Sequence, residues 1–277
     1  MTALLRSELL KQRSTRLSWG LPLVMFASGL VLSAVMAAVV AFGALTFGVS
    51  ELPLQEVLPD LGVARLVYTS GISFGYLLTL VLGVLAMGQE FRHRTATGTF
   101  LASPRRGRVV AAKAAVLVPV AAVNGAAHLA GAIVGGGVVL ALNDLAVFPE
   151  PGQLMRTLAL GLLVMVLWAL IGLGLGALIT NQVAALFLAV ALAWIIEPLL
   201  GWGLTFLDGG DAVARFFPSQ ATTATLSLYE GMDPQLAQMM GAAGEQLPWW
   251  GGGLVLAGYA AVLAGIGAWL TSRRDIT

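Results

Sequence analysis

Six long apolar stretches follow one another along this chain, separated by shorter polar segments. They cover approximately residues 19–46, 65–88, 109–141, 153–179, 183–206 and 249–271. Each exceeds the ~20 residues that a helix needs to cross about 30 Å of hydrocarbon. The pattern predicts an all-α integral membrane protein with six transmembrane helices.

Two details refine this pattern. Only Asn181 and Gln182 separate the fourth and fifth stretches, which favours a tight helical hairpin over one unbroken helix. Residues 1–17 are polar and basic, and we expect them to form an interfacial helix before the first span. A cleaved signal peptide is the alternative, but the apolar run that follows is too long for one.

Composition agrees with a membrane protein. Hydrophobic residues make up 58% of the 277 residues and charged residues 10%, and the mean hydropathy is +0.89. A soluble domain has about 25% charged residues. Small residues recur inside the apolar stretches, and we interpret their spacing as helix packing; they are Gly71 and Gly75, Gly131 and Gly135, and Gly172, Gly174 and Gly176.

The charges are divided between the two sides that six spans would create. Twelve of the fifteen basic residues fall on the side of the termini: Arg6, Lys11, Arg13, Arg16, Arg92, Arg94, Arg105, Arg106, Arg108, Lys113, Arg273 and Arg274. Ten of the fourteen acidic residues fall on the other side. The positive-inside rule therefore predicts that both termini are cytoplasmic, together with the loop at 89–107.

The loop at 89–107 contains apolar as well as basic residues. Glu90 and Arg94 have the i, i+4 spacing that supports a short helix at the membrane surface, and Pro104 would end it. A solvated loop whose arginines only fix the topology remains equally open. On the other side, the segment 207–248 is expected to form short helices after Ser219 and Asp233, each residue acting as a cap, or else a solvated loop.

Three polar residues are predicted at membrane depth. At 1.5 Å per residue, Glu197 lies about 21 Å and Asn124 about 22 Å from the cytoplasmic ends of their helices. His128 is one turn beyond Asn124. These residues could face a substrate path or a subunit interface, because an intramembrane acid is a functional candidate. Alternatively, Glu197 is hydrated near the outer interface or is protonated.

Several kinds of chemistry find no support in the sequence. A nucleotide-binding P-loop needs Gly-Lys-Ser/Thr, but the only lysines, Lys11 and Lys113, follow Leu10 and Ala112. The chain has no cysteine and only two histidines, so thiolate and histidine-built metal sites are not expected. The membrane topology already accounts for the positions of the basic residues, so nucleic-acid binding is not expected either.

The loop sequence GQEFRHRTATGTFLASPRR, with an N-terminal helix and six spans, resembles the ABC-2 type permease family. The resemblance covers the whole chain, 1–277, as a single transmembrane domain, and it implies the membrane subunit of an ABC exporter in the plasma membrane. It also implies an ATPase-coupling site in the loop, with the residues Glu90, Phe91, Arg92, Arg94, Thr95, Thr99, Phe100, Ser103, Pro104 and Arg105.

In that family two permease subunits pair, and two separate ATPase subunits bind ATP and Mg on the cytoplasmic face. By this resemblance the chain itself holds no cofactor and is no enzyme, and its membrane partners are a second copy and lipid. The cargo, expected to be apolar or amphipathic, would pass between the second and fifth spans of the two copies. The candidates for that path are Phe74, Tyr76, Asn124, His128 and Glu197.

Two other functions stay open. An ion-coupled secondary transporter would need coupling residues, for which the sequence offers only Glu197 and no visible inverted repeat. A membrane anchor or sensor subunit that does not transport would keep the loop for partner binding without a substrate path.

Overall fold

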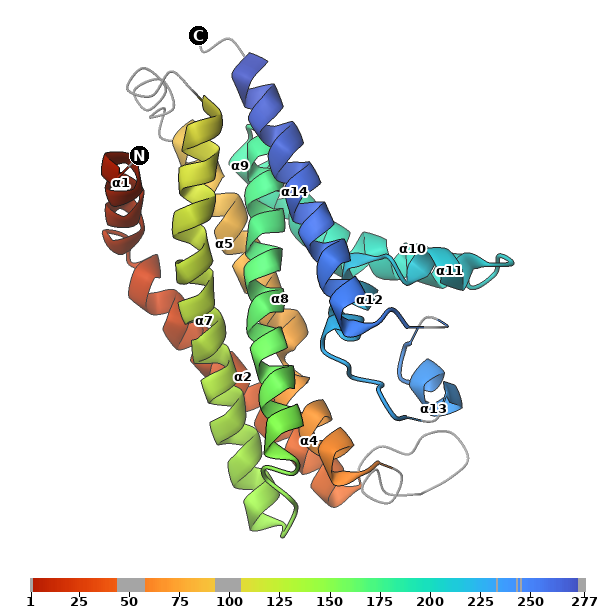
Figure 1. Cartoon of the computed structure of the whole chain (residues 1–277). Helices are drawn as coiled ribbons and strands as arrows, with labels where there is room; N and C mark the ends of the chain where they lie inside the picture. Colours follow the sequence, from red (N-terminus) through yellow and green to blue (C-terminus); the bar gives the residue numbers. More distant parts are fainter. Residues whose placement is uncertain are drawn as a thin grey trace.

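The computed structural model describes residues 2–43, 58–92, 106–232, 234–242, 244 and 246–273. All regular elements within these ranges are helices (Figure 1). Six helical stretches are long and apolar enough to cross a membrane. The predicted all-helical fold with six candidate membrane spans is therefore confirmed.

The candidate spans follow the predicted order. They are α2 (Leu17–Phe42), α4 with α5 (Asp60–Thr69 and Ile72–Arg92), α7 (Arg106–Leu142), α8 (Pro151–Leu178), α9 with η1 and α10 (Gln182–Ala191, Leu192–Ile196 and Glu197–Leu204), and α14 (Trp249–Arg273). A shorter helix, α1 (Thr2–Arg13), precedes them, where the sequence predicted a helix over 1–17.

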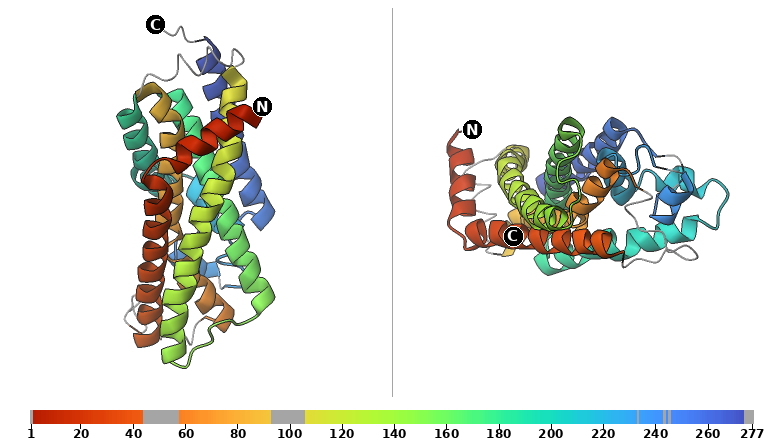
Figure 2. Two further views of the ribbon diagram at one scale, coloured as in Figure 1. Left: turned by 90° about the vertical axis from the view of Figure 1, so that its left-hand side faces the viewer. Right: turned by 90° about the horizontal axis from the view of Figure 1, so that it is seen from below.

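α7 and α8 form the centre of the bundle (Figures 1 and 2). α2 lies along α7, while α5 and α14 pack against α8. The main core joins α5, α7 and α8 through side chains such as Leu80, Leu117 and Met165. A second cluster around Tyr68 and Leu154 fills the end where α4 meets α8. Large apolar side chains on α2, α9–α10 and α14 remain on the outside, as a bilayer requires.

The closest approaches between neighbouring helices occur at glycines. A Cβ on Gly131 or Gly135 of α7 would collide with the carbonyl oxygen of Phe26 or of Leu30 in α2. A Cβ on Gly172 of α8 would collide in the same way with Leu80 of α5. The predicted use of small residues for helix packing is confirmed at these positions.

The hairpin between the fourth and fifth spans is also confirmed. The Asn181 side chain accepts hydrogen bonds from the backbone nitrogens of Val183 and Ala184 at 3.0 and 3.2 Å, and so caps α9. Asparagine is among the residues most favoured at this position, because its oxygen satisfies donors that have no partner in the first turn.

Two spans differ from their predicted form. The second begins at Asp60 rather than near residue 65 and is interrupted at Ser70 and Gly71, so Arg65 lies inside a helix instead of at its outer end. The fifth is bent, because a π-helical turn at Leu192–Ile196 and Pro198 disturb the regular backbone ladder. α10 consequently turns away from the bundle (Figure 1).

The polar connections are partly helical. α5 extends to Arg92 and α7 begins at Arg106, so the helices reach into the predicted loop at 89–107. The segment 207–248 contains α11 (Gly210–Ala214), α12 (Pro218–Thr225) and α13 (Pro234–Met239). Helices are present where they were expected after Ser219 and Asp233, although α12 already begins at Pro218. α11 was not predicted, and the proposed Asp233 cap lies outside the described residues.

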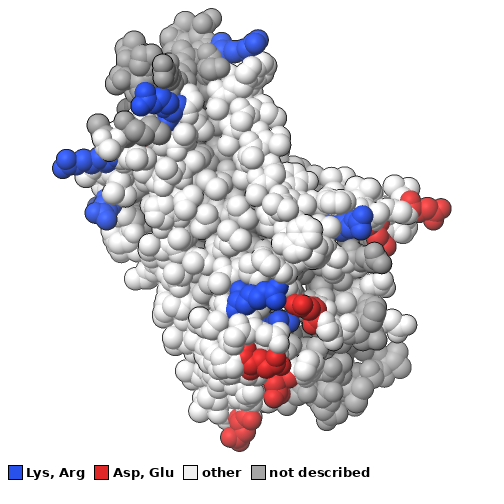
Figure 3. All heavy atoms as spheres, viewed as in Figure 1, with Lys and Arg blue, Asp and Glu red and all other residues white. Residues whose placement is uncertain are grey.

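α1 and the C-terminal end of α14 lie at the same end of the bundle (Figure 1). Basic side chains gather near this end in the space-filling view, while acidic and basic side chains mix at the opposite end (Figure 3). Basic side chains without acidic neighbours are thus found mainly at the end of the bundle that carries α1 (Figure 3).

Replacing Gly131 by Ala should lower the thermal midpoint of the purified protein. The added Cβ would meet the Phe26 carbonyl oxygen, and overpacking of this kind costs about 1–3 kcal/mol. That corresponds to a fall of roughly 3–10 °C in a chain of this size. Thermal unfolding in detergent measures the effect.

Gly258→Ala is the matched control, because the Cβ that it would add meets no atom within 4 Å beyond the local backbone of its own helix. Alanine is the better helix former by about 1 kcal/mol, so this variant should be at least as stable as the wild type. Equal midpoints for the two variants would contradict the close contact between α2 and α7.

Candidate functional site

Glu197 is the polar residue around which two cavities meet. It follows the π-helical turn and is buried, with 9% of its surface exposed. Its Oε1 accepts a hydrogen bond from the backbone nitrogen of Ser219 at 2.6 Å. π-Helical turns are frequent at functional sites, because they displace one side chain from the regular helix face.

This hydrogen bond uses the backbone N–H of Ser219, whereas the sequence pointed to its side chain. The sequence predicted that the Ser219 side chain would cap a short helix that follows it. Instead the cap residue of α12 is Phe217, which makes no side-chain capping bond, and the Ser219 N–H is satisfied by the carboxylate of Glu197. An acid at a helix N-terminus is favoured by the free N–H groups there and by the helix dipole. Glu197 thereby ties the fifth span to the outer segment.

One cavity beside Glu197 is apolar and lies within the bundle. Its volume is about 300 Å³, and α5, α8, η1 and α14 contribute Leu80, Trp168, Ile196 and Leu263 to its walls. Glu197 is the one charged residue among those that line it. An apolar cavity with a single polar anchor suits a hydrophobic or amphipathic molecule.

The second cavity lies under the outer segment and is more polar. It has a volume of about 330 Å³ and is lined by residues that include Trp202, Asp211, Gln220 and Gln238. Glu197 and Phe217 line both cavities. The start of α12, held by Glu197, therefore forms the wall between them.

Aromatic contacts support this wall. Tyr76 of α5 stacks on Trp168 of α8, with ring centroids 4.2 Å apart and planes 11° apart. The Trp168 Nε1 donates to the hydroxyl of Thr222 in α12 at 2.9 Å. Phe74 lies farther out and contacts Trp194 of η1 at 6.3 Å. Of the predicted path residues, Tyr76 is thus joined through Trp168 to the wall that Glu197 holds.

Asn124 and His128 belong to a different part of the bundle. The ring of His128 is fully buried, and its Nδ1 lies 3.2 Å from the carbonyl oxygen of Met25 and 3.1 Å from the Ser28 hydroxyl, both on α2. Gly71, just before α5, and Gly75 of α5 make room for the other side of the ring. His128 therefore packs three helices together and lines neither cavity beside Glu197.

Asn124 lines a third cavity, between α1, α2, α5 and α7. The predicted patch of Glu197, Asn124 and His128 is therefore not one site. The depth arithmetic assigned similar heights to Glu197 and Asn124 but carried no information about the direction in which each side chain points.

The predicted ATPase-coupling residues mostly lie outside the described residues. Glu90, Phe91 and Arg92 form the end of α5, and nothing further is described of their side chains. The remaining residues lie in the undescribed range 93–105: Arg94, Thr95, Thr99, Phe100, Ser103, Pro104 and Arg105. This site stays a prediction.

Sequence reasoning missed a buried ion pair between α1 and α7. The Lys113 Nζ lies 2.7 Å from Glu8 Oε2, and both side chains are about 5% exposed or less. Lys11 contacts the other oxygen of Glu8 at 2.8 Å. A signal was available, because Glu8 is the only acid among the first fifty residues and Lys113 is the only charged residue in the third apolar stretch.

Arg65 forms a second polar connection that was missed. Its guanidinium is buried and donates to the Gln153 side chain of α8 at 3.2 Å and to the Ser227 carbonyl oxygen at 3.4 Å. The Glu230 carboxylate lies 4.0 Å away. Arg65 therefore ties α4 and α8 to the loop that follows α12.

Within the described ranges, no group of three or more His, Asp or Glu side chains could hold a metal ion. No family model matches the chain, and no curated protein matches it. The assignment of function therefore rests on the sequence and the geometry alone.

Replacing Glu197 by Ala should loosen α12. The Ser219 N–H would lose a charged acceptor, and hydrogen bonds to charged groups contribute about 1.5–3 kcal/mol. Local opening would then increase about tenfold or more. Arg215 is the only trypsin site in the segment 207–248, so the rate of tryptic cleavage there in nanodiscs reports the opening.

Trypsin should cleave the Glu197→Gln variant at a rate between those of the Glu197→Ala variant and the wild type. The amide oxygen can still accept the hydrogen bond, but it carries no charge. Asp208→Ala removes an exposed acid nearby and should leave the rate unchanged. Cleavage of Glu197→Ala at the wild-type rate would show that the carboxylate does not hold α12.

Proposed function

We propose that this chain is the transmembrane permease subunit of an ATP-driven transporter of the ABC-2 type. Two copies would pair in the plasma membrane, with both termini in the cytoplasm, and two separate ATPase subunits would bind and hydrolyse MgATP. The cargo would be an apolar or amphipathic compound that is moved outward.

The observation that carries the proposal is the position of the two helix ends that flank the basic loop. The end of α5 and the start of α7 lie at the same end of the bundle as α1 and the C-terminal end of α14 (Figure 1). The sequence between these two helix ends carries the resemblance to the permease family. The positive-inside rule gives this end a cytoplasmic location, where ATPase subunits are found.

The ion pair between Glu8 and Lys113 supports a mechanical role for this end. Lys113 lies about two turns into α7, directly after the loop, and it joins that helix to α1. Breaking a buried pair by removing one partner costs about 3–5 kcal/mol, so α1 and the first part of α7 should move together. A movement that an ATPase imposes on the loop would be transmitted to the bundle through both helices.

The cavity beside Glu197 supports an apolar or amphipathic cargo. It adjoins α5 and η1, which belong to the second and fifth spans. Phe74 and Trp194 contact each other where these two spans meet, and Trp194 is about half exposed. In the proposed dimer, this face would meet its copy and the cargo would pass beside it.

A pull-down from native membranes tests the proposal. With the chain tagged, an ABC ATPase should co-purify with the wild type and be lost when Glu90→Ala and Arg94→Ala are combined. The double variant Asp208→Ala with Arg215→Ala is the control, because it removes one acid and one base from the opposite side. If no ATPase is recovered with the wild type, the model of a separate ATPase fails, and an ion-coupled transporter centred on Glu197 becomes the better description.

The proposed orientation has its own test, since the chain contains no cysteine. In sealed right-side-out vesicles, Asp208→Cys should react with a membrane-impermeant maleimide, whereas Ser7→Cys should react only after permeabilisation. Both positions are exposed in the structure. The reverse pattern would place the basic loop outside and would exclude contact with a cytoplasmic ATPase.

A further inference from the structure

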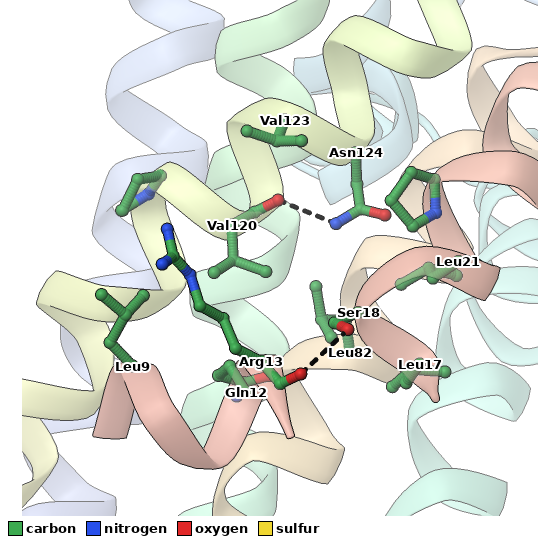
Figure 4. Close-up of a pocket in the computed structure, with 12 residues that line it drawn as sticks. Leu9, Gln12, Arg13, Leu17, Ser18, Leu21, Leu82, Val120, Val123 and Asn124 are labelled. Atoms are coloured by element: carbon green, nitrogen blue, oxygen red, sulfur yellow. Dashed lines mark hydrogen bonds between the residues drawn. The ribbon is translucent and has the colours of Figure 1, made fainter. Parts of the chain in front are cut away.

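A third cavity lies where α1 turns into α2, beside α5 and α7 (Figure 4). Its volume is about 260 Å³, and its walls are mainly apolar. The apolar side chains that line it include Leu9, Leu17, Leu21, Leu82, Val120 and Val123. This cavity is separate from those beside Glu197, with which it shares no lining residue.

Asn124 contributes a buried acceptor to this cavity. Its Nδ2 donates to the carbonyl oxygen of Val120 at 2.8 Å, which turns Oδ1 away from that carbonyl group (Figure 4). The side chain is only 3% exposed, and Oδ1 has no hydrogen-bond partner among the described residues. Since a buried polar atom without a partner is unfavourable, a hydroxyl donor from a ligand would stabilise this site.

Arg13 supplies a positive charge at the rim. It is the last residue of α1, and its side chain extends across the cavity toward α7 near Val120 (Figure 4). The acid nearest to it along α1, Glu8, already pairs with Lys11 and Lys113, one on each carboxylate oxygen. No ion pair in the described part of the chain includes Arg13. Its charge is therefore available to an anionic ligand.

The size and opening of the cavity indicate that it holds only part of its ligand. Pockets for drug-sized ligands have volumes of about 300–1,000 Å³, and this one is smaller. Val123 lines the cavity and is 62% exposed on the outer surface of α7. An acyl chain could therefore leave the cavity at Val123 and continue along the apolar face of α7.

We propose that this cavity binds an anionic phospholipid whose headgroup carries hydroxyl groups. Its phosphate binds Arg13, a hydroxyl donates to Asn124 Oδ1, and the first part of an acyl chain packs between Leu21, Leu82 and Val120. This inference goes beyond the proposed function and does not depend on it, because the binding needs neither an ATPase nor a cargo. The lipid holds the junction of α1 and α2 against α7.

Lipid-dependent thermal stabilisation of the delipidated protein tests the charge requirement. Phosphatidylglycerol should raise the midpoint of the wild type more than phosphatidylcholine does, and glycerol phosphate without chains should have no effect. In Arg13→Gln the apparent affinity for phosphatidylglycerol should fall at least about tenfold, because a hydrogen-bonded charge is lost. Arg16→Gln removes the same charge three residues later, outside the cavity, and should bind as the wild type does.

A steric test uses the opening at Val123. Val123→Trp should block the acyl chain and abolish the preference for phosphatidylglycerol, whereas Val134→Trp, at a similarly exposed position of α7 outside the cavity, should retain it. Both tryptophans would face outward, so folding is preserved and is checked by the midpoint without lipid. Equal loss in Arg13→Gln and Arg16→Gln, or equal stabilisation by both lipids, would overturn the proposal in favour of general surface attraction.

Discussion

Contact between helix backbones is the constraint on which the rest of this structure depends. In a bilayer, apolar side chains gain little by leaving lipid for protein, so helices associate where small residues allow close packing. Gly29 meets the His128 carbonyl oxygen, Gly83 meets that of Ala169, and Gly174 packs on Leu263. These contacts set the positions of α2, α5 and α14 on α7 and α8. The His128 ring and the apolar cavity beside Glu197 lie between helices placed in this way.

Polar connections then fix the segments that the glycine contacts leave free. At one end, Glu8 and Lys113 join α1 to α7. At the other, Glu197 holds the start of α12 and Arg65 holds the loop after it. Each connection links a span to a segment outside the six spans. In the proposed transporter, they are the points at which a movement of the basic loop or of the outer segment reaches the bundle.

The sequence predicted how far along the bundle a residue lies better than it predicted the direction in which its side chain points. Apolar length located the six spans, and Asn181 located the hairpin, because both depend on local residues. Helical rise also assigned Asn124 and Glu197 similar depths, but their side chains point to different neighbours. The second stretch was predicted to start near residue 65, whereas α4 begins at Asp60 and carries Arg65 inside it. Rotation about a helix axis is set by the neighbouring helices, which no single segment reveals.

The bend in the fifth span places Glu197 between the apolar cavity and the polar cavity. The π-helical turn and Pro198 direct α10 away from the bundle and leave the carboxylate facing α12. A molecule in the apolar cavity can therefore reach the polar cavity only if the start of α12 moves, because Glu197 and Phe217 line both. That movement would break the hydrogen bond to Ser219 and leave a carboxylate in apolar surroundings, which is unfavourable unless the cargo or water replaces the donor. In a permease of the proposed kind, passage of cargo and opening of the outer segment would then be coupled through this one side chain.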